Sequence, residues 1–135
     1  MIWLRALSVW ALILAAEFAH GIARTLWLAP LVGDLASRQI GVATGSALIL
    51  GIAWLTVRWI GAQSRRQWLA VGALWVVLMV LAEALLARLM FGYPWSRVAE
   101  DFDPSRGGLL AFGMGVLLLA PWAMAQLRGP VSPPR

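Results

Sequence analysis

Four long apolar stretches, joined by short polar segments, constrain this chain more than any other feature of its sequence. They cover residues 6–27, 40–60, 68–91 and 108–127. A helix needs about 20 mostly apolar residues to cross the hydrocarbon core of a bilayer, so each stretch has the length of one membrane span. The sequence therefore predicts an all-α membrane protein, in which four transmembrane helices form one bundle and one domain, with the lipid bilayer as its main partner.

The composition agrees with residence in a membrane and excludes several kinds of site. Of the 135 residues, 61% are hydrophobic and 13% are charged, and there is no cysteine. Thiolate metal sites and disulfides are thus excluded, and His20 is the only histidine, so we expect no metal and no cofactor. The net charge of +5 is not gathered on any polar segment long enough to form a basic face, and nucleic acid is not an expected partner.

The distribution of arginines predicts how the bundle is oriented. Six arginines, with no acid among them, fall on one side of the four spans, whereas the other five arginines and all six acids fall on the other side. Positive residues mark the cytoplasmic side of membrane proteins. We therefore expect a multi-pass protein of a bacterial-type inner membrane, with both termini in the cytoplasm. The six arginines are Arg5, Arg58, Arg65, Arg66, Arg128 and Arg135.

The two halves of the chain, residues 6–61 and 68–129, repeat the same order of features and leave a short polar tail at 130–135. Gly45 and Trp54, for example, correspond to Gly113 and Trp122 at a constant offset of 68. Each half holds two spans, so both halves keep the same orientation in the membrane. The sequence predicts two parallel-repeat helical hairpins related by a pseudo-twofold axis along the membrane normal.

The polar connections also carry structural signals. Between the third and fourth spans, Trp95, Val98 and Phe102 stand at helical spacing with charged residues between them, which predicts a short amphipathic helix on the outer surface. Asp34 and Asp103 stand where an N-cap would begin the second and fourth helices. We expect these two aspartates to be helix caps.

Charged residues inside the spans indicate which helix faces point into the bundle and where a functional site would lie. An acid within a span costs a few kcal/mol and is kept where it faces protein or water, so Glu17 and Glu83 should face the bundle interior. On a helix, Glu17, His20 and Arg24 share one face. We expect an intramembrane charge cluster in which the glutamates pair with arginines of neighbouring helices. Its expected members are Glu17, His20, Arg24, Arg38, Glu83, Arg88 and Arg106.

Three functions remain open for such a bundle. The absence of a catalytic constellation favours a non-enzymatic scaffold or accessory subunit, which self-associates or contacts another membrane protein through small-residue faces such as Ala43, Ala47 and Gly51. The alternative is a small proton-coupled transporter or channel that uses Glu17 and Glu83, and a water-filled cavity reaching both residues would favour it over the scaffold. The third is a lipid- or isoprenoid-modifying enzyme with an acid and a base in the first span.

Overall fold

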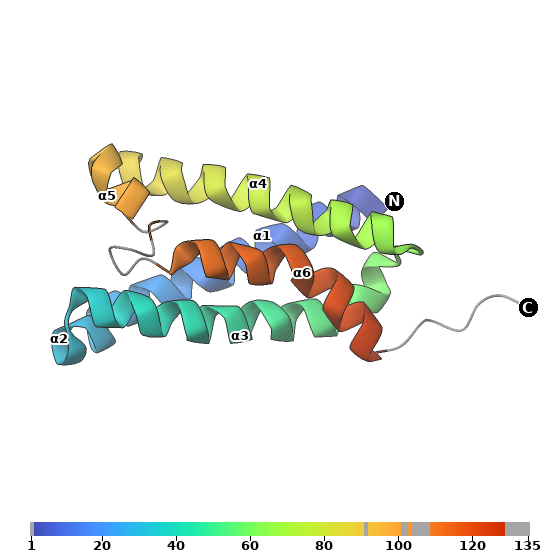
Figure 1. Cartoon of the computed structure of the whole chain (residues 1–135), viewed down its shortest axis with the longest axis horizontal. Helices are drawn as coiled ribbons and strands as arrows, with labels where there is room; N and C mark the ends of the chain where they lie inside the picture. The colour runs from blue at the N-terminus through green and yellow to red at the C-terminus, as the bar shows by residue number, and fades with distance from the viewer. Residues whose placement is uncertain (1, 91, 101–102, 104–108, 129–135) are drawn as a thin grey trace, which may run out of the picture.

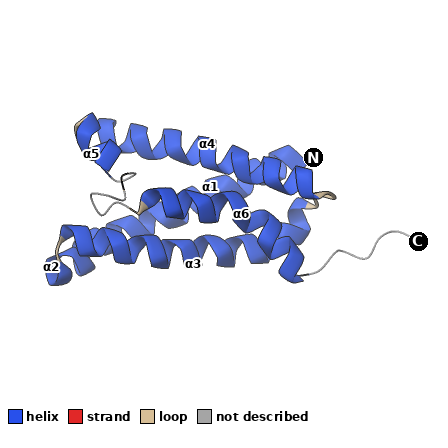
Figure 2. Cartoon of the chain, viewed as in Figure 1, coloured by secondary structure: helices blue, strands red, loops and turns tan. Residues whose placement is uncertain are grey.

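The computed structural model describes residues 2–90, 92–100, 103 and 109–128, and within these residues it is helical, with loops and no strand (Figures 1 and 2). The elements are α1 (Ile2–Ala23), the π-helix η1 (Arg24–Leu28), α2 (Ala29–Val32), α3 (Asp34–Ile60), α4 (Arg65–Leu89), α5 (Trp95–Glu100) and α6 (Leu110–Arg128).

Four helical segments are long and apolar enough to cross a membrane: Ile2–Val32, Asp34–Ile60, Arg65–Leu89 and Leu110–Arg128. This confirms the predicted all-helical class with four candidate spans, as in a multi-pass membrane protein. The first two helices extend further toward each other than the apolar stretches alone suggested. They meet at Gly33, whose φ of 91° is open to glycine and strained for other residues.

The four long helices form a bundle in which α1 contacts α3 and α4, and α6 contacts the same two helices (Figure 1). α1 and α4 run in one direction, and α3 and α6 run in the other. α3 and α4 move apart toward the end that holds α2 and α5, as Figure 1 shows. The bundle is therefore narrow at one end and wide at the other.

The buried apolar residues explain this shape, because they gather at the narrow end. The last buried residue of α1 is Ile13 and the last of α4 is Met79, whereas the first buried residue of α6 is Leu117. At the centre, the fully buried Trp75 donates its indole N–H to the carbonyl of Ala6 at 2.8 Å. The core residues are Ala6, Val9, Ile13, Ile49, Ala53, Val57, Ile60, Trp68, Val71, Trp75, Met79, Leu117 and Ala120.

One glycine allows the closest approach between two helices of this core. A Cβ placed on Gly72 of α4 would overlap the backbone carbonyl of Leu118 on α6. Small residues let membrane helices pack backbone against backbone, which strengthens their van der Waals contact. Gly72 thus fixes how α4 and α6 fit together.

The π-helix at the end of the first span follows from Pro30. Proline has no backbone N–H, so it cannot donate the α-helical bond to Leu26 four residues earlier. The chain forms the π-helix Arg24–Leu28 just before it, and the N–H of Ala29 bonds the carbonyl of Arg24. Such single π turns occur often at functional sites, and this one begins at a residue of the expected charge cluster.

The expectation that Asp34 is a helix cap is wrong, whereas that for Asp103 stays a prediction, because residues 104–108 lie outside the described residues. α3 begins at Asp34 itself, its N-cap is Gly33, and no side chain caps it. α6 begins at Leu110, well beyond Asp103. The Asp34 carboxylate is instead bound by arginines, because two guanidinium groups lie within reach and outweigh a local N–H.

Candidate functional site

A cavity of about 490 Å³ lies in the wide half of the bundle. All four long helices contribute to its lining at the three- and four-residue spacing of one helix face, as with Glu17 and Gly21 on α1 or Met79 and Glu83 on α4. Its volume falls in the range of small-molecule sites. The apolar part of the wall includes Leu14, Phe18, Ile49, Met79, Met114 and Leu117.

Glu17 reaches this cavity from α1 and packs against the backbone of α3. A Cβ placed on Gly45 would lie 2.8 Å from Glu17 Oε2, so a glycine at this position leaves room for the carboxylate. The buried Oε1 atom accepts no hydrogen bond from the described residues. Among these residues the ion partner of Glu17 is His20, with Nδ1 3.9 Å from Oε2. The expected arginine partner of Glu17 is thus not found there.

Glu83 lines the same cavity from α4. It thus shares the cavity with Glu17, although the two residues lie on different helices and are far apart in the sequence. Two carboxylates that share an apolar-walled cavity repel each other more strongly than they would in water. A proton or a cation held between them would relieve that repulsion.

The polar face predicted on the first helix is present, and it joins α1 and η1 to α3. His20 Nε2 is hydrogen-bonded with Thr44 Oγ1 at 2.6 Å, and Arg24 donates to Ser37 Oγ at 3.0 Å. The Arg24 side chain passes over Gly41, where an added Cβ would lie 2.6 Å from Arg24 Cδ. Together with Glu17, these residues form a row of polar contacts where the first span packs against α3.

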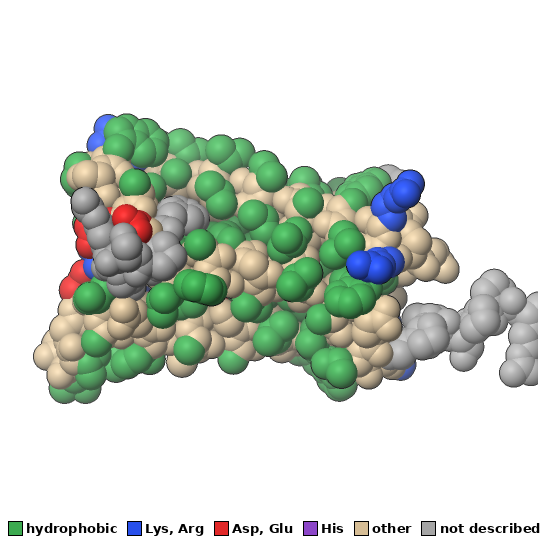
Figure 3. All heavy atoms as spheres, viewed as in Figure 1, with side chains coloured by type: hydrophobic (Ala, Val, Ile, Leu, Met, Phe, Trp, Pro, Cys, Tyr) green, Lys and Arg blue, Asp and Glu red, His purple; other side chains and the backbone are tan. Residues whose placement is uncertain are grey.

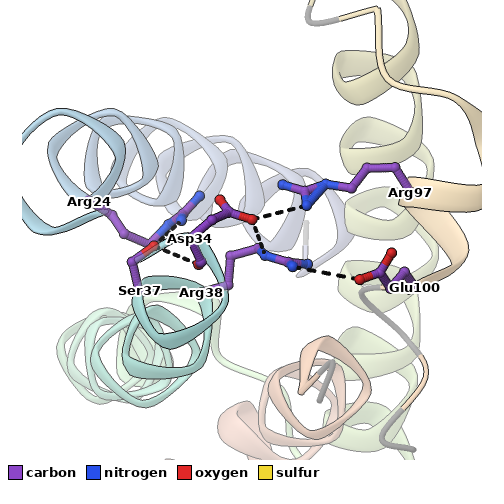
Figure 4. Close-up of polar contacts among 6 residues, drawn as sticks. All are labelled: Arg24, Asp34, Ser37, Arg38, Arg97 and Glu100. Carbon is purple, nitrogen blue, oxygen red and sulfur yellow. Dashed lines mark hydrogen bonds and ion pairs between the residues drawn. The ribbon is translucent and has the colours of Figure 1, made fainter. Parts of the chain in front are cut away.

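An ion network, drawn in Figure 4, lies at the wide end of the bundle, and we call this end of the cavity its mouth. Arg97 donates to Asp34 Oδ2 at 3.1 Å, and the Nε of Arg38 lies 3.2 Å from the same oxygen. Arg38 Nη2 also lies 3.8 Å from Glu100 Oε1. Asp34, Arg38 and Arg97 all line the cavity. The network therefore connects the start of α3 with α5, and we call this region the mixed-charge end.

Arg97 and Glu100 were missing from the cluster expected from the sequence. Their only sequence signal was their place in the short predicted helix, which α5 confirms as a helix and which brings both side chains to α3. Arg88, in contrast, donates to the carbonyl of Tyr93 at 3.1 Å and lies 4.9 Å from the Trp95 ring centroid, and it does not line the cavity. Arg106 lies outside the described residues.

The opposite end of the bundle carries arginines whose partners are backbone carbonyls and tryptophan rings. Arg5 donates to the carbonyl of Trp59 at 2.9 Å, and Arg128 donates to that of Trp54 at 2.9 Å. Arg58 donates to the carbonyl of Arg128 at 3.0 Å. On the face drawn in Figure 3, described acids appear only at the mixed-charge end. We call this second region the arginine end.

Comparisons with protein-family models, curated proteins and solved structures found no match to this chain. Within the described residues, no group of three or more histidine, cysteine, aspartate or glutamate residues is placed to hold a metal ion. The site thus combines three carboxylates, of which Asp34 is bound by arginines, with a set of guanidinium groups in one largely apolar cavity.

Proposed function

We propose that this protein is a small proton-coupled transporter or channel in which Glu17 and Glu83 bind the translocated proton or cation. The observation that supports this proposal is that both glutamates line one cavity of about 490 Å³. A Glu17 that served only to hold the bundle together through a charge pair would instead lie against an arginine. Among the described residues Glu17 has no such partner within ion-pair distance, and its Oε1 accepts no hydrogen bond.

The proposed mechanism follows from the two carboxylates and from the shape of the bundle. An ionisable residue within a membrane helix is costly unless it faces protein or water, and such residues often mark ion or proton pathways. The wide end gives the proton or cation a route to Glu17 and Glu83, and the tightly packed core closes the route beyond them. Transport requires the core half to loosen while the wide half closes.

A flux measurement tests this proposal. The purified protein is reconstituted into liposomes that hold a pH-sensitive dye, and a membrane potential is imposed with potassium and valinomycin. We expect proton influx above that of protein-free liposomes, and we expect Glu83→Gln to remove it because an amide cannot exchange a proton. Influx equal to that of protein-free liposomes would contradict the proposal.

We also propose that the arginine end faces the cytoplasm of a bacterial-type inner membrane, with both termini there. This rests on the separation of charges described above and on the positive-inside rule. Alkaline phosphatase fused after Arg135 is expected to be inactive, and green fluorescent protein fused at the same position is expected to fluoresce. In this orientation α5 lies at the outer surface. An active phosphatase fusion without fluorescence would reverse the assignment.

An internal duplication is a further part of this proposal. It is supported by the shared direction of α1 with α4 and of α3 with α6. The matched positions have different surroundings, however: Gly45 packs on Glu17, whereas an added Cβ on Gly113 would lie 3.6 Å from Val42 Cγ1. Corresponding helices are also neighbours around the bundle, whereas a central twofold axis along the membrane normal would place them opposite each other. This arrangement of the helices does not support the twofold axis, and the relation stays a prediction.

An accessory subunit is the second candidate function. Ala43, Ala47 and Gly51 form an exposed small-residue face on α3, and no atom lies within 4 Å of a Cβ added at Gly51. This face is open to a second copy or to another membrane protein. Absent flux together with stable association in detergent would favour this function.

A further inference from the structure

Glu17 and Arg24, which have no oppositely charged Arg, Asp or Glu partner within ion-pair distance among the described residues, lie at two levels of the same cavity. At the deeper level is the Glu17 carboxylate, whose buried Oε1 accepts no hydrogen bond from the described residues, and Glu83 adds a second carboxylate to the lining. At the mouth is Arg24, whose hydrogen-bond partner within the described residues is the neutral hydroxyl of Ser37. Nearby, the buried Nε of Arg97 has no hydrogen-bond partner within the described residues.

The wall between the two levels is mostly apolar, and His20, whose Nε2 is hydrogen-bonded with Thr44, also lines it. Arg24 follows Glu17 by seven residues on one continuous helical segment, so their Cα atoms differ by about 10 Å along the axis at 1.5 Å per residue. The lining between these levels includes Phe18 and Ile22 of the first span and Leu86 of α4. A small molecule that filled the cavity would contact acids at one end, guanidinium groups at the other and mostly hydrocarbon between them.

We propose that the ligand of this cavity is a zwitterion, with a cationic group and an anionic group separated by an apolar spacer of several carbon atoms. The cationic group binds Glu17 and Glu83, and the anionic group binds Arg24 with help from Arg97. This inference rests on the proposed function and names its substrate class. Each end of the ligand satisfies a buried polar group that is otherwise left without a full set of partners, which is costly in an apolar surrounding.

The other arginines at the mouth are less suited than Arg24 to bind the anionic group of a ligand. Arg38 lies close to both Asp34 and Glu100, and Arg97 donates to Asp34 through Nη1. Their charges are thus already balanced by acids. Among the described residues that line the cavity at this end, the remaining positive charge belongs to Arg24, and that charge selects an anionic group on the ligand.

Calorimetric titration of the full chain in lipid nanodiscs tests the inference, with empty nanodiscs subtracted. The probes are 6-aminohexanoate, hexylamine, hexanoate and glycine. 6-Aminohexanoate carries both charges on a long spacer, the two hexyl compounds each lack one charge, and glycine lacks the spacer. We expect 6-aminohexanoate to bind on the order of tenfold more tightly than each of the others, since one charge-assisted hydrogen bond contributes that much.

Variants assign the two ends of the ligand. Glu17→Gln is expected to weaken 6-aminohexanoate to the level of hexanoate, and Arg24→Gln to the level of hexylamine. Arg24→Lys keeps the charge and should retain most of the affinity, so it separates loss of binding from loss of folding. Arg88→Gln, which changes an arginine outside the cavity, should leave the affinity unchanged.

Several outcomes would overturn the inference. If hexylamine bound as tightly as 6-aminohexanoate, the site would require only a cationic group, and if hexanoate did so, it would require only an anionic group. If glycine bound as tightly, the site would not require an apolar spacer. Absence of binding by all four probes, with proton flux intact, would overturn the zwitterion while leaving the proposed function standing. Absence of both binding and flux would overturn both.

Discussion

Glu17→Gln is expected to abolish proton flux while leaving thermal unfolding nearly unchanged. The amide keeps the size of the side chain and still fits against Gly45, but it cannot ionise. The ionic contact that it loses is the one to His20 at 3.9 Å, and a contact of this length between partly exposed groups contributes less than about 1 kcal/mol. We expect the melting temperature in detergent to fall by no more than a few degrees, as about 1 kcal/mol would produce.

Glu100→Gln is the matched control for this experiment. It makes the same chemical change in an acid of the mixed-charge end that does not line the cavity, and flux should stay at the wild-type rate. A Glu17→Gln variant with normal flux and a strongly lowered melting temperature would contradict the prediction. It would show that Glu17 holds the bundle together, which favours the accessory subunit.

Gly72→Ala is expected to destabilise the bundle by about 3 kcal/mol or more. The added Cβ would overlap the backbone carbonyl of Leu118, and a backbone atom cannot rotate away as a side chain can. Overpacking of a core typically costs about 1 to 3 kcal/mol, and here α4 and α6 must separate along their contact. The loss is measured as the free energy of unfolding in mixed micelles with increasing denaturing detergent.

Gly115→Ala on α6 is the control for this substitution. No atom lies within 4 Å of a Cβ added there, so the variant should unfold within about 1 kcal/mol of the parent protein, with the change in helix propensity as the main contribution. If Gly72→Ala unfolded like Gly115→Ala, the close contact between α4 and α6 would be refuted.

The helical fold could be predicted because it depends on long apolar stretches. Each stretch can be recognised from its own residues, without knowledge of the rest of the chain. The polar face on the first helix was equally accessible, since the spacing of Glu17, His20 and Arg24 fixes their common direction once a helix is assumed. These features depend on local geometry alone. The structure places all three residues along the seam with α3, as their spacing suggested.

The partners of these residues could not be predicted in the same way. Asp34 was expected to cap a helix, because capping is a rule about neighbours in sequence, whereas Arg97 lies 63 residues away. The cavity depends on how far α4 diverges from α3, which no single stretch encodes. The sequence marks Gly45 as a matched position of the two halves, and the structure shows that it makes room for the Glu17 carboxylate.

The uneven placement of the core has a mechanical consequence. The buried apolar residues of α1 and α4 end at Ile13 and Met79. These two helices are therefore tightly packed at one end only. A tilt of a few degrees about this packed end moves the other ends by about 1 to 2 Å, given a rise of 1.5 Å per residue, without breaking a helix. The wide halves can therefore begin to close over the cavity before the core loosens in the proposed transport step.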